Sequence, residues 1–138
     1  MAKNLVIIPT YNEIENIEKM IRTVFDLPTG IEILIVDDGS PDGTADKVKE
    51  LQQKFPNQLH IEERQGKLGL GTAYIHGFKW ALKNNYDYIF EMDCDFSHNP
   101  QDLIRLLEAC ENGADVAVGS RYCKGGQISN WPIGRILM

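Results

Sequence analysis

The sequence predicts an α/β protein with three layers, α/β/α, in which helices cover both faces of a mostly parallel sheet. Short runs rich in β-branched and aromatic residues alternate along the chain with segments whose apolar residues recur at helical spacing. The resulting order, βαβαβαβαβ, is typical of parallel strands joined by right-handed crossovers. The chain has 138 residues, 43% of them hydrophobic, which is enough for one domain with a substantial core.

Five strands are expected, because five short runs of β-forming residues end at charged or turn-forming residues. These runs are residues 5–8, 31–36, 59–61, 86–92 and 115–118. In a parallel sheet the segments that follow the strands lie together at one edge, where open α/β sheets bind their ligands. The residues just after each run are therefore the first candidates for a functional site.

Four helices are expected between the strands, each identified by apolar residues three or four positions apart. The fourth is expected to begin at Asn99 as N-cap, with Pro100 at its first position and Asp102 in its first turn. The apolar positions of the four helices are Ile14, Ile17, Met20, Ile21 and Val24; Ala45, Val48 and Leu51; Ala73, Phe78, Ala81 and Leu82; and Leu103, Leu106, Leu107 and Cys110.

The end of the sequence differs from the rest in composition. After Cys123, residues 124–127 (Lys-Gly-Gly-Gln) predict a loop. Residues 136–138 are apolar and lack a capping pattern, so the chain is expected to stop inside an element that normally continues. We therefore expect residues 1–138 to be the N-terminal part of a domain whose C-terminal portion is missing.

Composition and charge exclude several classes of protein. The net charge of −6 argues against a nucleic-acid partner, because binding to the phosphate backbone requires a basic face. The sequence has no apolar run long enough to span a bilayer and no signal-peptide pattern. Three cysteines without Cys-x-x-Cys spacing favour reduced thiols over disulfides or zinc. A cytoplasmic location is expected.

Two carboxylates, Asp93 and Asp95, flank Cys94 where the fourth strand gives way to the next helix. Hard oxygen ligands at such a loop suit Mg²⁺ or Mn²⁺, which share substrate phosphates with a few carboxylates. Asp-x-Asp is short enough to occur by chance, so this pattern alone leaves a metal site and a structural loop equally open. Cys94 is expected to be a small filler side chain, because neighbouring carboxylates oppose thiolate formation.

Polar loops after the first and second strands are expected at the same edge, and this convergence favours a ligand site over chance. The first loop follows Pro9, and the second begins with Asp37 and Asp38. Clustered carboxylates repel one another unless a cation or bound hydroxyls offset their charge. An acid after the second strand of a nucleotide-binding fold typically contacts ribose or base, so Asp37 or Asp38 is expected to recognise a nucleotide, with turn structure as the alternative.

Two further segments offer positive charge. Lys67 lies in a glycine-rich stretch before the third helix, where backbone amides and the ammonium group could meet a phosphate. This stretch is neither a P-loop nor a dinucleotide fingerprint, and a flexible loop is an equal alternative. Arg121 follows the fifth strand and could clamp a diphosphate or pair with an edge carboxylate. His60 and His76 lie away from these loops and are expected to be structural or solvated.

Five motifs in order together resemble glycosyltransferase family 2, and within it the polyprenol-phosphate (dolichol-phosphate) mannosyltransferases. They occupy residues 8–13, 36–44, 67–71, 92–98 and 119–122. The resemblance implies the A-type nucleotide-sugar transferase fold and a nucleotide-diphospho-sugar-binding domain over residues 1–138. It also implies metal-dependent transfer of mannose from GDP-mannose to a polyprenol phosphate, with Mg²⁺ or Mn²⁺, and a possible peripheral contact with the cytoplasmic face of a membrane.

The resemblance also implies roles for single residues. Asp95 and Arg121 would be catalytic, and Ser97 would be a weak third metal ligand where some members have Gln. The base and ribose of the donor would contact Pro9, Tyr11 and Glu13, and its nucleoside would contact Asp38, with Asp37 beside it. Lys67 and Arg121 would bind the phosphates, and Arg135 would contact the diphosphate or the acceptor. Asp93 and Asp95, with Cys94 between them, would hold the metal.

The expected mechanism is a single displacement with inversion. A divalent cation and Arg121 would stabilise the charge on the departing GDP. A phosphate acceptor is already ionised near neutral pH, so no general base is expected. Three alternatives remain: a family-2 transferase that uses a UDP-sugar and another acceptor, a nucleotide-sugar-binding fragment without turnover, and a signalling module such as a phospho-receiver. The last is disfavoured, because Arg121 stands where a receiver carries a lysine.

Overall fold

The computed structural model describes residues 3–65, 69–94, 100–111, 117–118 and 126–127. Four strands form a sheet in the order β3-β2-β1-β4, and every pairing within it is parallel. The strands are β1 (Asn4–Thr10), β2 (Glu32–Asp37), β3 (Leu59–Glu63) and β4 (Tyr88–Glu91). The predicted parallel sheet is confirmed.

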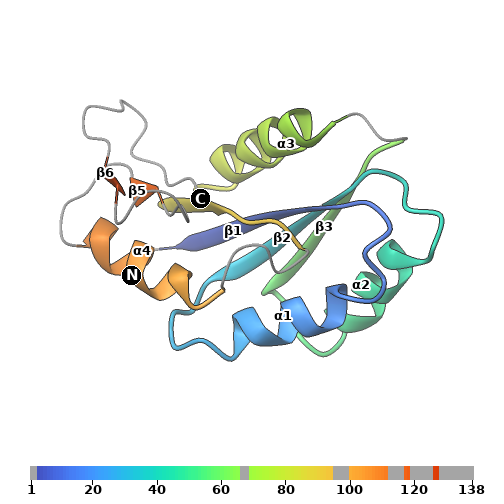
Figure 1. The fold of residues 1–138 in the computed structure, drawn as a ribbon, viewed down its shortest axis with the longest axis horizontal. Coiled ribbons are helices and arrows are strands. Elements are labelled where there is room, and N and C mark those ends of the chain that lie inside the picture. The colour runs from blue at the N-terminus through green and yellow to red at the C-terminus, as the bar shows by residue number, and fades with distance from the viewer. Residues whose placement is uncertain (1–2, 66–68, 95–99, 112–116, 119–125, 128–138) are drawn as a thin grey trace.

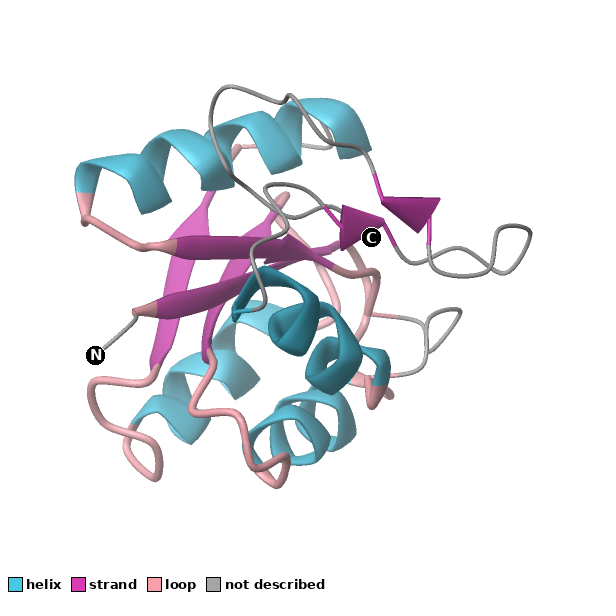
Figure 2. Ribbon diagram, turned by 90° about the vertical axis from the view of Figure 1, so that its left-hand side faces the viewer, coloured by secondary structure: helices cyan, strands magenta, loops and turns pink. Residues whose placement is uncertain are grey.

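Helices cover both faces of this sheet and complete the three predicted layers. Helix α3 (Leu70–Lys83) lies on one face, whereas α1 (Ile17–Phe25), α2 (Thr44–Gln52) and α4 (Asp102–Glu111) lie on the other (Figure 1). The view from the side shows the sheet between the two helical layers (Figure 2). Within the described residues, no helix is long and apolar enough to cross a membrane.

The core divides along the two faces because neighbouring residues of a strand point to opposite sides. Leu5 and Ile7 of β1 belong to the apolar cluster beneath α3, whereas Val6 and Ile8 belong to the cluster beneath the other helices. All four are 0% exposed, as expected for a parallel strand buried on both faces. The continuous apolar runs that predicted the strands follow from this double burial.

Gly77 determines how closely α3 approaches the sheet. A Cβ atom at this position would lie 2.6 Å from Cγ2 and 2.9 Å from Cδ1 of Ile7 in β1. No side chain other than hydrogen fits at these distances, so glycine lets the helix backbone pack directly on the strand. The depth of α3, and with it the position of every side chain on its inner face, depends on this contact.

Several elements differ in detail from the prediction. Ile14, expected on the inner face of the first helix, is 38% exposed and precedes α1, because its backbone N–H binds Asp42 in the next loop at 3.1 Å. Leu82 on α3 is 44% exposed. Helix α4 begins at Asp102, after a turn in which the N–H of Leu103 binds the carbonyl of Pro100.

The fifth predicted strand does not join the parallel sheet. Its described residues, β5 (Ala117–Val118), pair antiparallel with β6 (Gly126–Gln127), which lies in a segment predicted to be a loop. Parallel pairing needs a crossover of about a dozen residues or more, and the segment between the two strands is shorter than that. The expectation of a fifth parallel strand was therefore wrong for these residues.

The strand order places a topological switch point between β1 and β4. From β1 the chain proceeds to β2 and β3 on one side, and β4 then pairs with the opposite side of β1. Open α/β sheets bind ligands outside the carboxyl ends of the strands at this point. We call the carboxyl ends of β1 to β4, with the residues that follow them directly, the carboxyl edge.

Candidate functional site

The structure gathers seven of the predicted site residues at the carboxyl edge. They are Pro9, Tyr11, Glu13, Asp37, Asp38, Asp93 and Cys94, which end or directly follow β1, β2 and β4. The other predicted site residues lie outside the described residues, and their roles stay predictions: Lys67, Asp95, Ser97, Arg121 and Arg135.

Asp37 holds the loops after β1 and β2 together. This residue is 1% exposed, and its carboxylate accepts hydrogen bonds from Thr10 Oγ1 at 2.7 Å, from the N–H of Ser40 at 2.9 Å and from Ser40 Oγ at 2.6 Å. Ser40 Oγ in turn accepts a bond from the N–H of Asn12 at 2.9 Å. This network supports the interpretation of Asp37 as a residue of turn structure, one of the two left open by the sequence.

A second set of hydrogen bonds fixes Glu13 beside the loop after β2. The N–H of Glu13 binds Thr44 Oγ1 at 3.0 Å, and Thr44 is fully buried at the start of α2. The carboxylate of Glu13 accepts a hydrogen bond from Asn16 Nδ2 at 3.2 Å. The backbone that carries Tyr11 and Glu13 is therefore anchored at both of its ends before any ligand arrives.

Asp38 forms a bidentate ion pair with Arg64, which follows β3. Arg64 Nε and Nη2 donate to Asp38 Oδ1 and Oδ2 at 2.7 and 2.9 Å, and the two side chains are 9% and 8% exposed. Arg64 also donates to Thr72 Oγ1 at 3.1 Å and to the carbonyl of Gly69 at 3.3 Å. The pair therefore links the end of β2 to the start of α3.

Arg64 was not among the residues predicted to form the site. The available signal was its position directly after the third strand, at the edge already predicted to carry acids. Removing a carboxylate from water is costly unless a partner offsets its charge, and a planar guanidinium does so with two parallel bonds. A neutralised Asp38 can be buried next to a ligand without the repulsion expected for a cluster of bare acids.

The carboxylate of Asp93 is hydrogen-bonded to a tyrosine of α3. Tyr74 Oη, from α3, donates to Asp93 Oδ1 at 2.8 Å, and both residues are half-buried. Glu91 precedes Asp93 by two positions and so points to the same side of the strand. Burial, together with the negative charge of Asp93, raises the pKa of the Glu91 carboxyl to about 7. Neither Tyr74 nor Glu91 was assigned a role from the sequence.

The chemistry at the end of β4 fits a hard divalent cation. Glu91 and Asp93 offer carboxylate oxygens, the ligands that Mg²⁺ and Mn²⁺ prefer, and their mutual repulsion is of the kind that a cation offsets. In the part of the chain that the structure describes, no three ligating side chains come together. Of the predicted ligands Asp93, Asp95 and Ser97, the last two lie outside that part.

Cys94 contributes to the core beside the site. Its side chain is 2% exposed and belongs to the apolar cluster that includes Met92 and Leu103. The expectation of a small filler side chain agrees with this position. Since the thiol is buried, any contact of this residue with a donor falls to its backbone.

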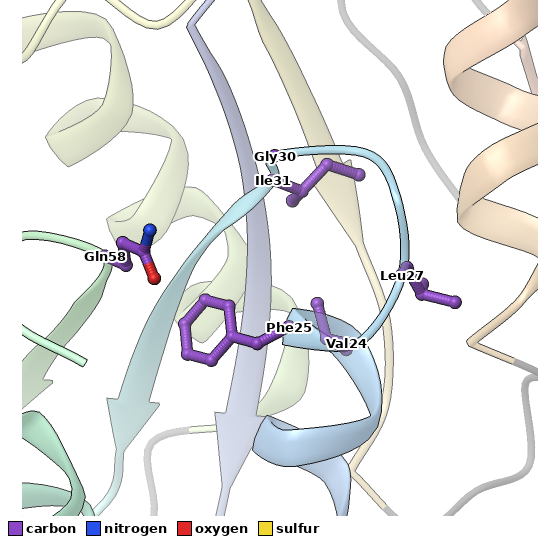
Figure 3. A pocket seen from close by; sticks show the side chains of 6 residues that line it. All are labelled: Val24, Phe25, Leu27, Gly30, Ile31 and Gln58. Carbon is purple, nitrogen blue, oxygen red and sulfur yellow. The ribbon is translucent and has the colours of Figure 1, made fainter. Parts of the chain in front are cut away.

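A small cavity of about 60 Å³ lies at the other end of the sheet. Its lining comes from the end of α1, the turn before β2 and Gln58 before β3 (Figure 3). A cavity of this size holds a water molecule or two and no nucleotide. The candidate site therefore rests on the carboxyl edge and not on this cavity.

Comparisons with known proteins agree with the motifs. The sequence model of glycosyl transferase family 2 matches residues 5–136. A polyprenol monophosphomannose synthase from Mycolicibacterium smegmatis is 48% identical over 136 residues, covering 99% of this chain and 51% of that protein. A dolichol-phosphate mannosyltransferase from Pyrococcus furiosus is 44% identical over 135 residues, covering 96% of this chain and 37% of that protein. The chain thus spans about half or less of these relatives.

Solved structures share the fold. The mannosyltransferase PcManGT from Pyrobaculum calidifontis, in complex with GDP-Man and Mn²⁺, superposes with a TM-score of 0.71 at 24% identity, covering 85% of this chain and 34% of that one. TarS 1–349 from S. aureus superposes with a TM-score of 0.64 at 23% identity, covering 91% and 38%. These likenesses confirm the predicted A-type architecture.

Proposed function

This chain belongs to glycosyl transferase family 2, and we propose that its carboxyl edge binds GDP-mannose together with Mg²⁺ or Mn²⁺. In the whole protein, this site would transfer mannose to a polyprenol phosphate. The named relatives support the donor and the acceptor, because they are a polyprenol monophosphomannose synthase and a dolichol-phosphate mannosyltransferase. The GDP-Man and Mn²⁺ complex of a protein with the same fold supports the metal.

One observation carries the proposal: two held carboxylates flank β1 at the switch point. Asp38 follows β2 and is fixed by Arg64, whereas Asp93 follows β4 and is fixed by Tyr74. Asp38 suits hydrogen bonds to the nucleoside, since it stands at the second strand of a nucleotide-binding fold. Asp93 suits the cation and the diphosphate. A donor that lies across the end of β1 would contact both Asp38 and Asp93.

Each residue then has a task in the transfer. Pro9, Tyr11 and Glu13 would contact base and ribose, Lys67 and Arg121 the diphosphate, and Arg135 the diphosphate or the acceptor. A bound cation would supply Lewis-acid stabilisation of the departing GDP. Asp93 and Asp95 would hold that charge in place, with Ser97 beside them, and Arg121 would add hydrogen bonds that strengthen as the glycosidic bond breaks.

The acceptor needs no general base. A phosphate monoester has its second pKa at about 6, so the attacking oxygen is anionic at neutral pH. Attack on the anomeric carbon forms the new bond on the face opposite the departing GDP, and the product is inverted. A transfer assay with the full-length protein and NMR of the product would check this, since retained configuration contradicts a single displacement.

Calorimetry with a panel of donors tests the proposed site in this chain. The panel is GDP, UDP and their mannose and glucose conjugates, each titrated with and without Mn²⁺. We expect GDP-mannose to bind most tightly and only weakly without Mn²⁺. A preference for a UDP-sugar would favour the alternative transferase, and a lack of Mn²⁺-dependent binding to any member of the panel would remove the donor site.

We also propose that the protein works at the cytoplasmic face of a membrane through a peripheral contact. The reason is the acceptor, a lipid whose phosphate lies at the membrane surface. Sedimentation with vesicles that contain a polyprenol phosphate, compared with vesicles that lack it, would measure this contact. Equal sedimentation with both kinds of vesicle would contradict an acceptor-dependent contact.

A further inference from the structure

We infer that Tyr74 is a positioning residue for Asp93, whose carboxylate it orients for a divalent cation and the donor diphosphate. The inference rests on the proposed function and goes beyond it, because it assigns a task to a residue outside the strand-end loops. Tyr74 Oη lies 2.8 Å from Asp93 Oδ1. This bond joins two segments, α3 and the end of β4, that also pack against each other through apolar side chains.

Gly77 explains why the hydroxyl reaches this point. Tyr74 and Gly77 are three positions apart and therefore lie on the same side of α3. Since a Cβ at Gly77 would come within 2.6 Å of Ile7, only glycine allows α3 to lie this close to β1. Tyr74 packs partly buried against the cluster between α3 and the sheet, which fixes the direction of its ring. The hydroxyl is thus held at a defined place before Asp93 binds anything.

The bond leaves Asp93 able to serve as a ligand. A carboxylate has about four acceptor positions on its two oxygens, and the tyrosine uses one of them. Donation to an ionised acceptor is also stronger than donation to a neutral one, and it offsets part of the repulsion between Asp93 and Glu91. Hydrogen bonds of this kind to metal ligands typically change metal affinity about 10- to 100-fold.

The chain contains a matched control for this bond. Tyr86, at the amino ends of the strands, donates its hydroxyl to Glu32 Oε1 at 2.7 Å, nearly the same distance. Replacing either tyrosine by phenylalanine removes one hydroxyl from one carboxylate. Only Tyr74→Phe removes it from a carboxylate of the proposed site. The difference between the two variants therefore separates an effect on the orientation of Asp93 from an effect on the stability of the protein.

The experiment measures Mn²⁺ affinity in the presence of GDP, from the signal of free Mn²⁺ in electron paramagnetic resonance. We expect Tyr74→Phe to weaken Mn²⁺ binding on the order of tenfold. Tyr86→Phe should leave it unchanged, although its melting temperature should fall. Tyr74→His retains a ring N–H donor and should bind Mn²⁺ more tightly than Tyr74→Phe. If the phenylalanine variant does not fold, the histidine variant is compared with wild type in its place.

The outcomes separate this inference from the proposed function. Equal Mn²⁺ affinity in folded wild type and Tyr74→Phe overturns the positioning role and leaves the donor site intact. Equal Mn²⁺ affinity in the histidine and phenylalanine variants, both below wild type, also overturns it, because a hydrogen-bond donor at position 74 would then have no effect on Mn²⁺ binding. Absence of Mn²⁺ binding by the wild-type chain overturns both, since Asp93 would have no cation to meet.

Discussion

At the amino ends of the strands, a tyrosine donates to an acid that has a basic partner, whereas at the carboxyl edge a tyrosine donates to an acid that has an acidic neighbour. Glu32 lies 2.7 Å from Tyr86 Oη and 2.8 Å from His60 Nε2. Asp93 lies 2.8 Å from Tyr74 Oη, and its charge contributes to the raised pKa of Glu91. The same hydrogen bond thus occurs in two electrostatic settings.

The amino-end cluster is complete in itself. The Trp80 ring lies 5.1 Å from His60 and 5.8 Å from Tyr86, and the ammonium of Lys3 lies 4.3 Å from the centre of the Tyr86 ring. Burial and the bond to Glu32 raise the pKa of Tyr86 above its ordinary value. This cluster joins the carboxylate of Glu32 to a hydroxyl and an imidazole ring and covers them with aromatic rings, which is the arrangement of a structural element, and it agrees with the structural role predicted for His60.

The carboxyl edge gathers like charges and leaves part of them for a ligand to offset. Perturbed carboxyl groups of this kind concentrate at functional sites, although ion-pair networks also produce them. What distinguishes the two ends is therefore the balance of charge, and not the number of hydrogen bonds. Each of the following changes tests one side of this contrast, and the expected effects decrease from the first to the last.

Asp38→Ala should have the largest effect on stability. It leaves the buried guanidinium of Arg64 without its carboxylate, and breaking a buried ion pair from one side costs about 3–5 kcal/mol. Denaturant unfolding would measure this loss. Asp102→Ala is the control, because its pair with Arg105 is exposed, and it should cost no more than about 1 kcal/mol. Similar losses in both variants would show that the Asp38 pair is not buried in solution.

Gly77→Ala should reduce the free energy of unfolding by about 1–3 kcal/mol, because the added methyl group would overlap Ile7. Gly71→Ala, in the same helix, is the control. A Cβ there meets nothing within 4 Å, and alanine is the better helix former, so this change should be neutral or stabilising by up to about 1 kcal/mol. If both alanines are tolerated equally, α3 does not lie as close to β1 as the structure has it.

Glu91→Gln should alter how stability depends on pH. The pKa of Glu91 rises from 4.5 to about 7 on folding, so the folded state retains its proton longer than the unfolded state. Stability is therefore highest below pH 4.5 with respect to this group and falls as pH rises toward 7. Glutamine does not titrate, so the variant should lack this fall in stability, which is on the order of 1 kcal/mol after allowance for partial exposure.

Thermal unfolding in EDTA at a series of pH values would measure the Glu91 effect without a bound cation. Glu15→Gln, on an exposed turn, is the control and should retain the wild-type profile. A Glu91→Gln profile that falls as steeply as wild type between pH 4.5 and 7 would show that Glu91 does not carry this dependence.

The sequence allowed much of the fold to be predicted, because buried parallel strands need apolar runs and the chain returns to the sheet through helices of ordinary length. The carboxyl-edge acids could be predicted for the same reason, since their place follows from where the strands end. Arg64 and Tyr74 could not. The partner of Arg64 depends on the register in which β3 pairs with β2, since Asp37 lies opposite Glu63. The partner of Tyr74 depends on the depth of α3, which the contact of Gly77 with Ile7 sets across a large distance in sequence.

The position of Ile14 and the pairing of β5 also depend on contacts that no local pattern contains. Ile14 leaves the helix because its N–H binds Asp42 in another loop, and β5 pairs with a segment rich in glycine that propensity assigns to a loop. The roles of Lys67, Asp95, Ser97, Arg121 and Arg135 remain predictions that rest on the family resemblance.

The most direct test of the contrast between the two ends is calorimetric titration of GDP-mannose, with and without Mn²⁺, into wild type, Asp93→Asn and Glu32→Gln. We expect Mn²⁺ to strengthen binding to wild type and to Glu32→Gln alike, and to have no such effect on Asp93→Asn. Retention of the Mn²⁺ effect in Asp93→Asn, or its equal loss in folded Glu32→Gln, would contradict a donor site at the carboxyl edge.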